Sequence, residues 1–279
     1  MFSNEAPIAV IDSGVGGISV LKELIRLMPN ENYIYFGDNK NAPYGNKTAE
    51  KVRELMFSNV SMLLDMGAKA IVIACNTATA ASVSSLREKY PDLDIIGIEP
   101  AIKPTVKYKE NSNVLVMATT LTLKQDKFAE LLYRFCDDVN IMTLACPGLM
   151  EFIEAGKTEG AELEEFLKEL FSNVEGIKFD SVVLGCTHYP HIKETIKKVL
   201  GDDVMIFDGG EGTARETKRK LELSGLLNQS QTKGYLKILC SSEENNIEKL
   251  SLKLLEKKKS HGVYLVDFVT LFLLYLQIA

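Results

Sequence analysis

AIVIACNT at residues 70–77 and SVVLGCTH at residues 181–188 are two similar stretches, one in each half of the chain. Each is a short, continuous apolar run that ends in a cysteine followed by polar residues. Continuous apolar runs bounded by polar turns are typical of central strands that are buried on both faces of a parallel sheet. The two stretches therefore predict equivalent buried strands, each with a thiol at its carboxyl end.

The similarity between the two halves extends to four apolar runs in each. Their starts keep a nearly constant offset: Ile8, Tyr33, Ala70 and Ile95 in the first half, and Val114, Ile141, Ser181 and Val204 in the second. Helix-like stretches lie between them, at residues 15–27, 48–66, 78–89, 122–135, 162–171 and 191–200. Any parallel α/β protein produces regularly spaced apolar runs, but the paired cysteine endings favour duplication of one α/β unit.

Alternation of strands and helices predicts an α/β fold with mainly parallel sheets covered by helices. We expect two pseudo-symmetric, doubly wound domains with the active site in the cleft between them. The first domain is expected to comprise residues 1–99 and 210–279, and the second residues 100–209. Ligands bind at the carboxyl ends of strands in such sheets, so the residues that end the apolar runs are the functional candidates.

Composition narrows the class of protein. The chain has 279 residues, of which 46% are hydrophobic, enough for a substantial core. Its formal net charge of −6 and the lack of a basic stripe argue against a nucleic-acid partner. The amino terminus does not resemble a secretory signal, and the apolar run at residues 268–279 is shorter than the roughly 20 residues that span a bilayer. We therefore expect a cytoplasmic protein without a membrane partner, whose five cysteines are free thiols.

The first strand runs into the stretch DSGVGG at residues 12–17. Its glycines and the helix that follows are compatible with a phosphate-binding turn, but neither the GxGxxG nor the GxxxxGK[ST] motif is present. A tight turn that binds a small carboxylate is the better interpretation. Taken alone, Asp12 or Ser13 is better explained as a cap of the following helix.

Five motifs in order resemble glutamate racemases and the wider aspartate/glutamate racemase superfamily. They are DSGVGG at 12–17, YFGD at 35–38, PYG at 43–45, ACNTATA at 74–80 and LGCTHYP at 184–190. The resemblance covers residues 8 to about 213. It implies interconversion of L- and D-glutamate without a cofactor or a metal, a supply of D-glutamate for peptidoglycan, and a homodimer.

Inversion of an α-carbon requires a base on one face and an acid on the other, and two opposed thiols provide both. The resemblance assigns these roles to Cys75 and Cys186. It implies Asp12 as the catalytic auxiliary of the first thiol, and His188 with Glu154 as those of the second. Glu151 is an alternative to Glu154, because the alignment between Cys146 and the family's glutamate is not decisive.

The resemblance also implies the groups that bind glutamate. The expected substrate-binding residues are Asp12, Ser13, Pro43, Tyr44, Gly45, Cys75, Asn76, Thr77, Thr119, Thr122, Cys186, Thr187 and His188. No arginine occurs in these motifs, so neutral donors are expected to hold the two carboxylates of the substrate. Residues 124–126 (KQD) depart from the family pattern, from which we expect altered helix packing.

Three other functions fit parts of the sequence. One is racemisation of aspartate or another amino acid, because cavity shape sets substrate length. A second is a two-lobed amino-acid-binding protein, but such proteins are usually exported and the amino terminus does not resemble a secretory signal. A third is a thiol redox protein, but such proteins usually carry a CxxC pair, which the chain lacks. Cys136, Cys146 and Cys240 are expected to be structural. The tail at residues 268–279 is expected to form an amphipathic helix docked on the first domain, or a subunit contact.

Overall fold

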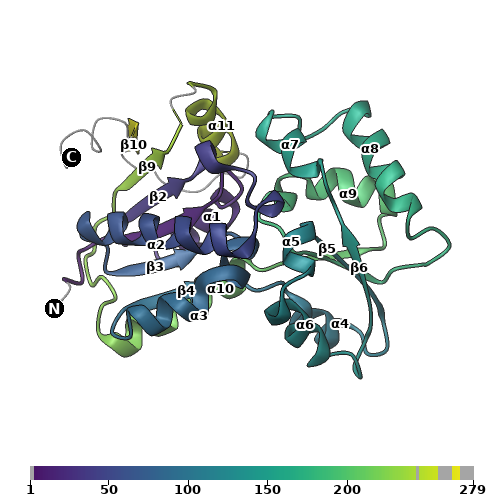
Figure 1. Cartoon of the computed structure of the whole chain (residues 1–279), viewed down its shortest axis with the longest axis horizontal. Helices are drawn as coiled ribbons and strands as arrows, with labels where there is room; N and C mark the ends of the chain where they lie inside the picture. The colour runs from purple at the N-terminus through teal and green to yellow at the C-terminus, as the bar shows by residue number, and fades with distance from the viewer. Residues whose placement is uncertain (1–2, 243–244, 257–265, 271–279) are drawn as a thin grey trace.

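The computed structural model describes residues 3–242, 245–256 and 266–270. They form two sheets of parallel strands, which lie side by side (Figure 1). The first sheet has the order β10-β9-β2-β1-β3-β4, with strands β1 (Ile8–Asp12), β2 (Tyr33–Gly37), β3 (Ala70–Ile73), β4 (Asp94–Gly97), β9 (Leu236–Cys240) and β10 (Val266–Thr270). The second has the order β6-β5-β7-β8, with strands β5 (Asn113–Ala118), β6 (Asn140–Ala145), β7 (Ser181–Leu184) and β8 (Met205–Asp208).

The order β2-β1-β3-β4 in one sheet is repeated as β6-β5-β7-β8 in the other, and every strand pair is parallel. The predicted α/β fold with two pseudo-symmetric, doubly wound sheets is thereby confirmed. The first sheet also carries β9 and β10 beyond β2, and the sequence interpretation did not anticipate these strands. The exact division at residues 99/100 and 209/210 stays a prediction.

Helices cover both faces of each sheet. Those of the first are α1 (Ile18–Leu27), α2 (Ala49–Asp65), α3 (Asn76–Lys89), α10 (Gly210–Ser224) and α11 (Asn245–Glu256), with short 3₁₀ turns η1 (Asn39–Asn41) and η2 (Tyr44–Asn46). Those of the second are α4 (Ile102–Tyr108), α5 (Thr120–Leu123), α6 (Asp126–Tyr133), α7 (Leu149–Glu154), α8 (Ala161–Ser172) and α9 (Lys193–Leu200), with the 3₁₀ turn η3 (Tyr189–Ile192). No described helix has the length and apolarity needed to cross a membrane.

Successive side chains of a strand point to opposite faces, so each sheet has two hydrophobic cores. In the first sheet, Val10 packs with α1, α10 and α11, whereas Ile11 packs with α2 and α3. In the second sheet, Leu115 packs with α7, α8 and α9, whereas Val116 packs with α4 and α6. Both faces of both sheets are thus buried, as the continuous apolar runs predict.

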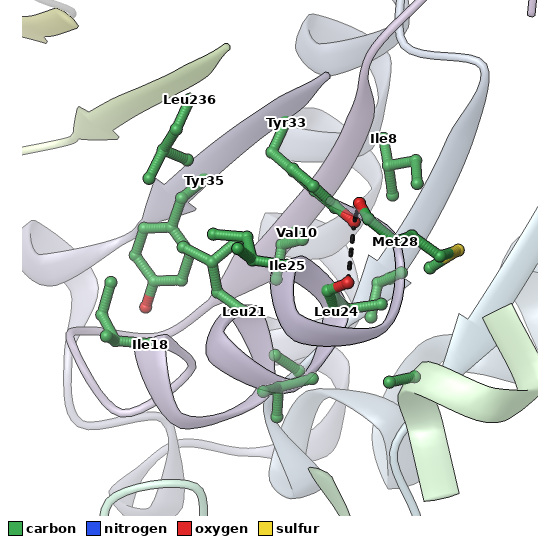
Figure 2. Packing of buried hydrophobic residues seen from close by; sticks show 14 of the residues in the cluster. Ile8, Val10, Ile18, Leu21, Leu24, Ile25, Met28, Tyr33, Tyr35 and Leu236 are labelled. Carbon is green, nitrogen blue, oxygen red and sulfur yellow. Dashed lines mark hydrogen bonds between the residues drawn. The ribbon is translucent and has the colours of Figure 1, made fainter. Parts of the chain in front are cut away.

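Two tyrosines of β2, Tyr33 and Tyr35, belong to the core that packs against α1 (Figure 2). The Tyr33 hydroxyl lies 3.0 Å and 2.9 Å from the carbonyl oxygens of Leu24 and Met28, at the carboxyl end of α1. The Tyr35 hydroxyl donates to the carbonyl oxygen of Gly14 at 2.6 Å. Tyr35, a buried residue of β2, therefore holds the glycine-rich turn in place.

Two expectations about helices are wrong. The stretch 122–135 is not one helix, because Gln125 adopts an extended conformation between α5 and α6. This break lies within residues 124–126, and it leaves α5 as a single turn capped by Thr119, whose hydroxyl accepts from Thr122 N. In the tail, residues 268–270 belong to strand β10 rather than to a helix. The rest of that stretch, 271–279, lies outside the described residues.

Candidate active site

The carboxyl ends of β1 and β3 in the first sheet meet those of β5 and β7 in the second. Thr187 Oγ1 donates to Asp12 Oδ2 at 2.9 Å, which joins the ends of β7 and β1. Thr77 and Thr119 Oγ1 are 2.9 Å apart, which joins the ends of β3 and β5. Groups from both halves thus converge in one place, where most of the predicted site residues lie.

Cys75 follows β3 and caps the start of α3. Its Sγ accepts a hydrogen bond from Ala78 N at 3.5 Å and lies 3.7 Å from Ser13 Oγ. A helix amino terminus favours a thiolate. Burial, followed by the charge of Asp12, nevertheless raises the pKa of the Cys75 thiol to about 12. Cys75 is therefore a protonated thiol at neutral pH.

Cys186 follows β7 and has a different neighbour. Its Sγ lies 3.7 Å from His188 Nδ1, and His188 Nε2 lies 2.7 Å from Glu154 Oε1. Burial lowers the pKa of His188, but the hydrogen bonds and charges of Cys186 and Glu154 outweigh it and raise the pKa well above its usual value. His188 is therefore an imidazolium that donates from Nε2 to Glu154 and directs Nδ1–H at Cys186.

Glu154 at the end of α7 connects the two halves. Its Oε1 accepts from His188 and also from Val15 N of the glycine-rich turn, at 3.0 Å. Burial raises the pKa of this carboxyl, but the hydrogen bond and charge of His188, with the Val15 N–H, outweigh it and lower the pKa. Glu151 is exposed on the same helix. Of the two glutamates left open by the sequence, Glu154 is therefore the one in contact with His188.

Glycines in the turn at residues 14–17 permit this close approach. A Cβ on Gly14 would lie 2.0 Å from Glu154 Oε1, and a Cβ on Gly16 would lie 2.4 Å from His188 Nδ1. Any side chain at either position would displace the Glu154–His188 pair. The turn therefore acts as a surface against which the second half docks, and no phosphate-binding role is needed to explain its glycines.

Asp12 is fully enclosed at the end of β1. Its carboxylate accepts from Gly14 N at 2.9 Å and from the Thr187 hydroxyl. Burial is the largest influence and raises the pKa of Asp12, although the charge of His188 and these two hydrogen bonds oppose it. Asp12 thus lies where its charge acts on Cys75 and where it contacts the Cys186 segment.

Three threonine hydroxyls form a closed ring across the two halves. Thr77 Oγ1 is 2.9 Å from Thr119 Oγ1 and 3.0 Å from Thr122 Oγ1, and the last two are 2.9 Å apart. Thr119 is the N-cap of α5 and Thr122 is its third residue, so their hydroxyls lie next to each other in its first turn. All three belong to the expected substrate-binding set.

The predicted binding loop at residues 43–45 is fixed by a residue that the sequence analysis did not assign to the site. Asp38 is buried and accepts from the Tyr44 hydroxyl at 2.6 Å and from Ser241 Oγ at 2.8 Å. Asn41 and Asn59 also donate to its carboxylate. The signal was present, because Asp38 ends the YFGD motif directly after β2.

The remaining predicted residues lie around these groups. Gly45 approaches Thr119 so closely that a Cβ there would be 3.0 Å from the threonine Cβ. Asn76, the first residue of α3, is buried, and its Oδ1 has no hydrogen-bond partner within the described part of the chain. Pro43 lines a pocket of about 490 Å³, together with Asn39, Glu151, Glu154, Ile247 and Leu250.

The other three cysteines do not take part in these hydrogen bonds, although Cys146 packs in the same hydrophobic cluster as Cys186. Cys146 is buried after β6, Cys136 is exposed, and Cys240 is half-buried at the end of β9. Burial raises the pKa of the Cys146 thiol to about 12. Within residues 3–242, 245–256 and 266–270, no three His, Cys, Asp or Glu side chains converge as a metal site requires.

Comparison with known proteins agrees with this geometry. The profile of the Asp/Glu/Hydantoin racemase family matches residues 8–217. The chain belongs to this family. It is 52% identical to the glutamate racemase of Clostridium botulinum over 256 residues, which is 92% of this chain and 99% of that protein. It is 51% identical to the glutamate racemase of Clostridium perfringens (strain SM101) over 253 residues, 91% of this chain and 97% of that protein.

Solved structures extend the likeness to the fold. A glutamate racemase of Bacillus anthracis superimposes with a TM-score of 0.84 at 31% identity, covering 95% of this chain and 98% of that one. The glutamate racemase of Francisella tularensis, solved in complex with D-glutamate, superimposes with a TM-score of 0.81 at 28% identity, covering 96% and 99% of the two chains. The predicted family and fold are both confirmed.

Proposed function

We propose that this chain interconverts L- and D-glutamate, with Cys75 and Cys186 as the acid–base pair on opposite faces of the substrate. The observation that carries the proposal is the placement of two buried thiols at the ends of β3 and β7, equivalent strands of the two sheets. Relatives about half identical over nine-tenths of the chain are glutamate racemases, which favours glutamate over aspartate. The product, D-glutamate, is used for peptidoglycan synthesis.

The two thiols have different neighbours. His188 Nδ1 lies 3.7 Å from Cys186 Sγ and directs a hydrogen at it, so we assign the base in one direction of the reaction to Cys186. Cys75, with its pKa raised to about 12, is the acid. As Cys186 takes the α-proton, Cys75 delivers its own proton to the opposite face and becomes the thiolate that serves the reverse reaction.

The substrate brings two carboxylates and one ammonium group. Hydroxyl and amide donors from both halves are available for the carboxylates, and the Asp12 carboxylate is available for the ammonium. We assign substrate binding to Ser13, Pro43, Tyr44, Gly45, Asn76, Thr77, Thr119, Thr122 and Thr187. Their support is the family resemblance and their position around the two thiols.

The decisive experiment follows α-proton exchange of L-glutamate and L-aspartate in deuterated water, together with formation of each D-enantiomer. Cys75→Ser and Cys186→Ser are each expected to lower racemisation by on the order of 10³-fold or more, because each removes one of two obligatory acid–base groups. Cys136→Ser, at an exposed thiol, is the matched control and should behave like the unmodified chain. Absence of exchange from both amino acids with the unmodified chain would refute the assignment.

We also propose a division into domains, a cellular location and an oligomeric state. The proposed first domain comprises residues 1–99 and 210–279, and the second comprises residues 100–209. The packing of α10 on α1 and the pairing of β9 with β2 support this division. Limited proteolysis tests it. A cytoplasmic location is supported by the chemistry, because free thiols persist in reducing compartments, and cell fractionation tests it. A homodimer is expected from the family resemblance, and light scattering tests it.

A further inference from the structure

His191 is a titratable side chain at the site that the mechanism above does not use. It lies in η3, three residues after His188, and its N–H donates to the His188 carbonyl oxygen at 3.1 Å. Its ring Nε2 lies 3.2 Å from the carbonyl oxygen of Gly16, in the glycine-rich turn of the first half. A carbonyl oxygen only accepts, so Nε2 of His191 carries the hydrogen.

The same Gly16 peptide unit is in contact with His188. A Cβ on Gly16 would lie 2.4 Å from Nδ1 and 2.6 Å from Cε1 of the His188 ring, so the Gly16 Cα forms a wall directly against that edge of the imidazole. Nδ1 is also the atom that faces Cys186 Sγ. The two histidines thus contact one glycine from the same turn of chain, His188 at its Cα and His191 at its oxygen.

Gly16 is held within its own half as well. Ser19 N and Ser19 Oγ both donate to the Gly16 oxygen, at 3.0 Å and 2.8 Å. Ser19 Oγ also lies 2.9 Å from the carbonyl oxygen of Thr187, the residue before His188, so Ser19 already ties this turn to the Cys186 segment. The His191 hydrogen bond is a further tie from the second half, and it ends on the Gly16 oxygen itself.

We propose that His191 is a positioning residue of the Cys186 side, which holds the Gly16 peptide against His188 and so directs His188 Nδ1 at the Cys186 thiol. This inference rests on the proposed function for its catalytic meaning. It requires only hydrogen-bond donation at Nε2, and a side chain that supplies such a donor without titrating should replace His191.

Charge is a second influence of His191, and the test must separate it from the hydrogen bond. His191 contributes to the lowered pKa of Glu154, after burial, His188 and the Val15 N–H. The titratable groups that face His188 are Asp12 from β1, Glu154 from α7 and Cys186 from its own segment. A neutral replacement of His191 removes its charge, so comparison of two neutral replacements isolates the hydrogen bond.

The experiment compares His191→Gln, which keeps an amide donor near the position of Nε2, with His191→Leu, which has no donor. Lys193→Leu, two residues further along, is the control for introducing leucine at this turn. His191→Leu is expected to lower kcat by on the order of tenfold with little change in KM, because the acid–base group is misplaced while the binding groups remain. His191→Gln should stay within about twofold of the unmodified chain.

A second readout does not depend on turnover. The chain has three histidines, so ring resonances can be assigned by single substitutions, and the titration of His188 can be followed by NMR. With the wall released, His188 moves away from Cys186 and Glu154, and its pKa should be roughly one unit lower in His191→Leu than in His191→Gln. Equal His188 titration and equal kcat in the two variants would overturn the inference.

Folding and function are controlled separately. The thermal transition shows whether His191→Leu folds. If it does not, His191→Asn replaces it, because the shorter asparagine side chain does not extend to the position of Nε2 and so does not reach the Gly16 oxygen. If the unmodified chain does not racemise glutamate, the proposed function fails, but the NMR comparison still decides whether His191 positions His188.

Discussion

The Cys75 and Cys186 sides of the site differ in their neighbours, although β3 and β7 are equivalent strands of sheets with the same order. Cys75 has a hydroxyl, a helix amino terminus and the nearby charge of Asp12. Cys186 has an imidazolium held by a carboxylate. The two sheets share one strand order, but the groups around their thiols differ: burial and Asp12 raise the pKa of Cys75, whereas His188 directs Nδ1–H at Cys186.

The strongest test of this difference is His188→Asn, which removes the cation beside Cys186. We expect racemisation to fall by about 10²-fold, the size of a general acid–base contribution. L- and D-glutamate have equal free energies in water, so kcat/KM must fall by the same factor in both directions, which provides an internal check. Activity within twofold of the unmodified chain would show that the two sides do not differ in this way.

A second test acts on the Cys75 side. Asp12→Asn removes a negative charge that raises the pKa of Cys75, so that pKa should fall from about 12 and the thiolate should appear at lower pH. Each unit of pKa gives roughly tenfold more thiolate at a fixed pH below the pKa.

Alkylation of Cys75 by iodoacetamide between pH 8 and pH 10 measures this effect, with each modified peptide quantified by mass spectrometry. Cys136 in the same sample serves as the reference thiol. A rate at Cys75 that is unchanged or slower in Asp12→Asn would mean that burial alone controls this thiol.

The smallest effect is expected for the group behind His188. Glu154→Gln keeps an acceptor for Val15 N but removes the charge that stabilises the imidazolium, so the pKa of His188 should fall and kcat should drop roughly fivefold. Glu151→Gln, at an exposed carboxylate of the same helix, is the matched control and should leave kcat unchanged. Equal losses in both variants would point to general charge near the site rather than to the contact with His188.

Strands of this fold were predictable because their burial is encoded locally. Four observed strand starts lie within one residue of the predicted ones: Asp94, Asn113, Asn140 and Met205. The agreement follows because each apolar run begins where its strand enters the core. The break before α6 was not predictable, because apolar periodicity continues through residues 122–135 and only the φ and ψ angles of Gln125 interrupt the helix. Strand β9 pairs with β2 from far along the chain and β10 pairs with β9, and no local pattern specifies these pairings.

The motifs around the two thiols predicted most of the residues that the structure brings together, but not the contacts between the halves. Glu151 and Glu154 are neighbours on one helix face, so spacing does not distinguish them. The choice depends on which carboxylate reaches Val15 N across the interface. The same limit applies to Asp38, whose partners Tyr44, Asn59 and Ser241 are widely separated in the chain.

The ring formed by Thr77, Thr119 and Thr122 has a thermodynamic consequence for ligand binding. A hydroxyl has one hydrogen to donate, and a closed ring of three uses all three hydrogens internally. A carboxylate only accepts, so it can bind to the ring only when at least one internal hydrogen bond is exchanged for a bond to the ligand. Opening the ring therefore offsets part of the binding enthalpy at this position. In Thr119→Val the ring is already open before a ligand binds. Calorimetry should therefore show a smaller loss of glutamate-binding enthalpy for Thr119→Val than for a variant that removes an independent donor.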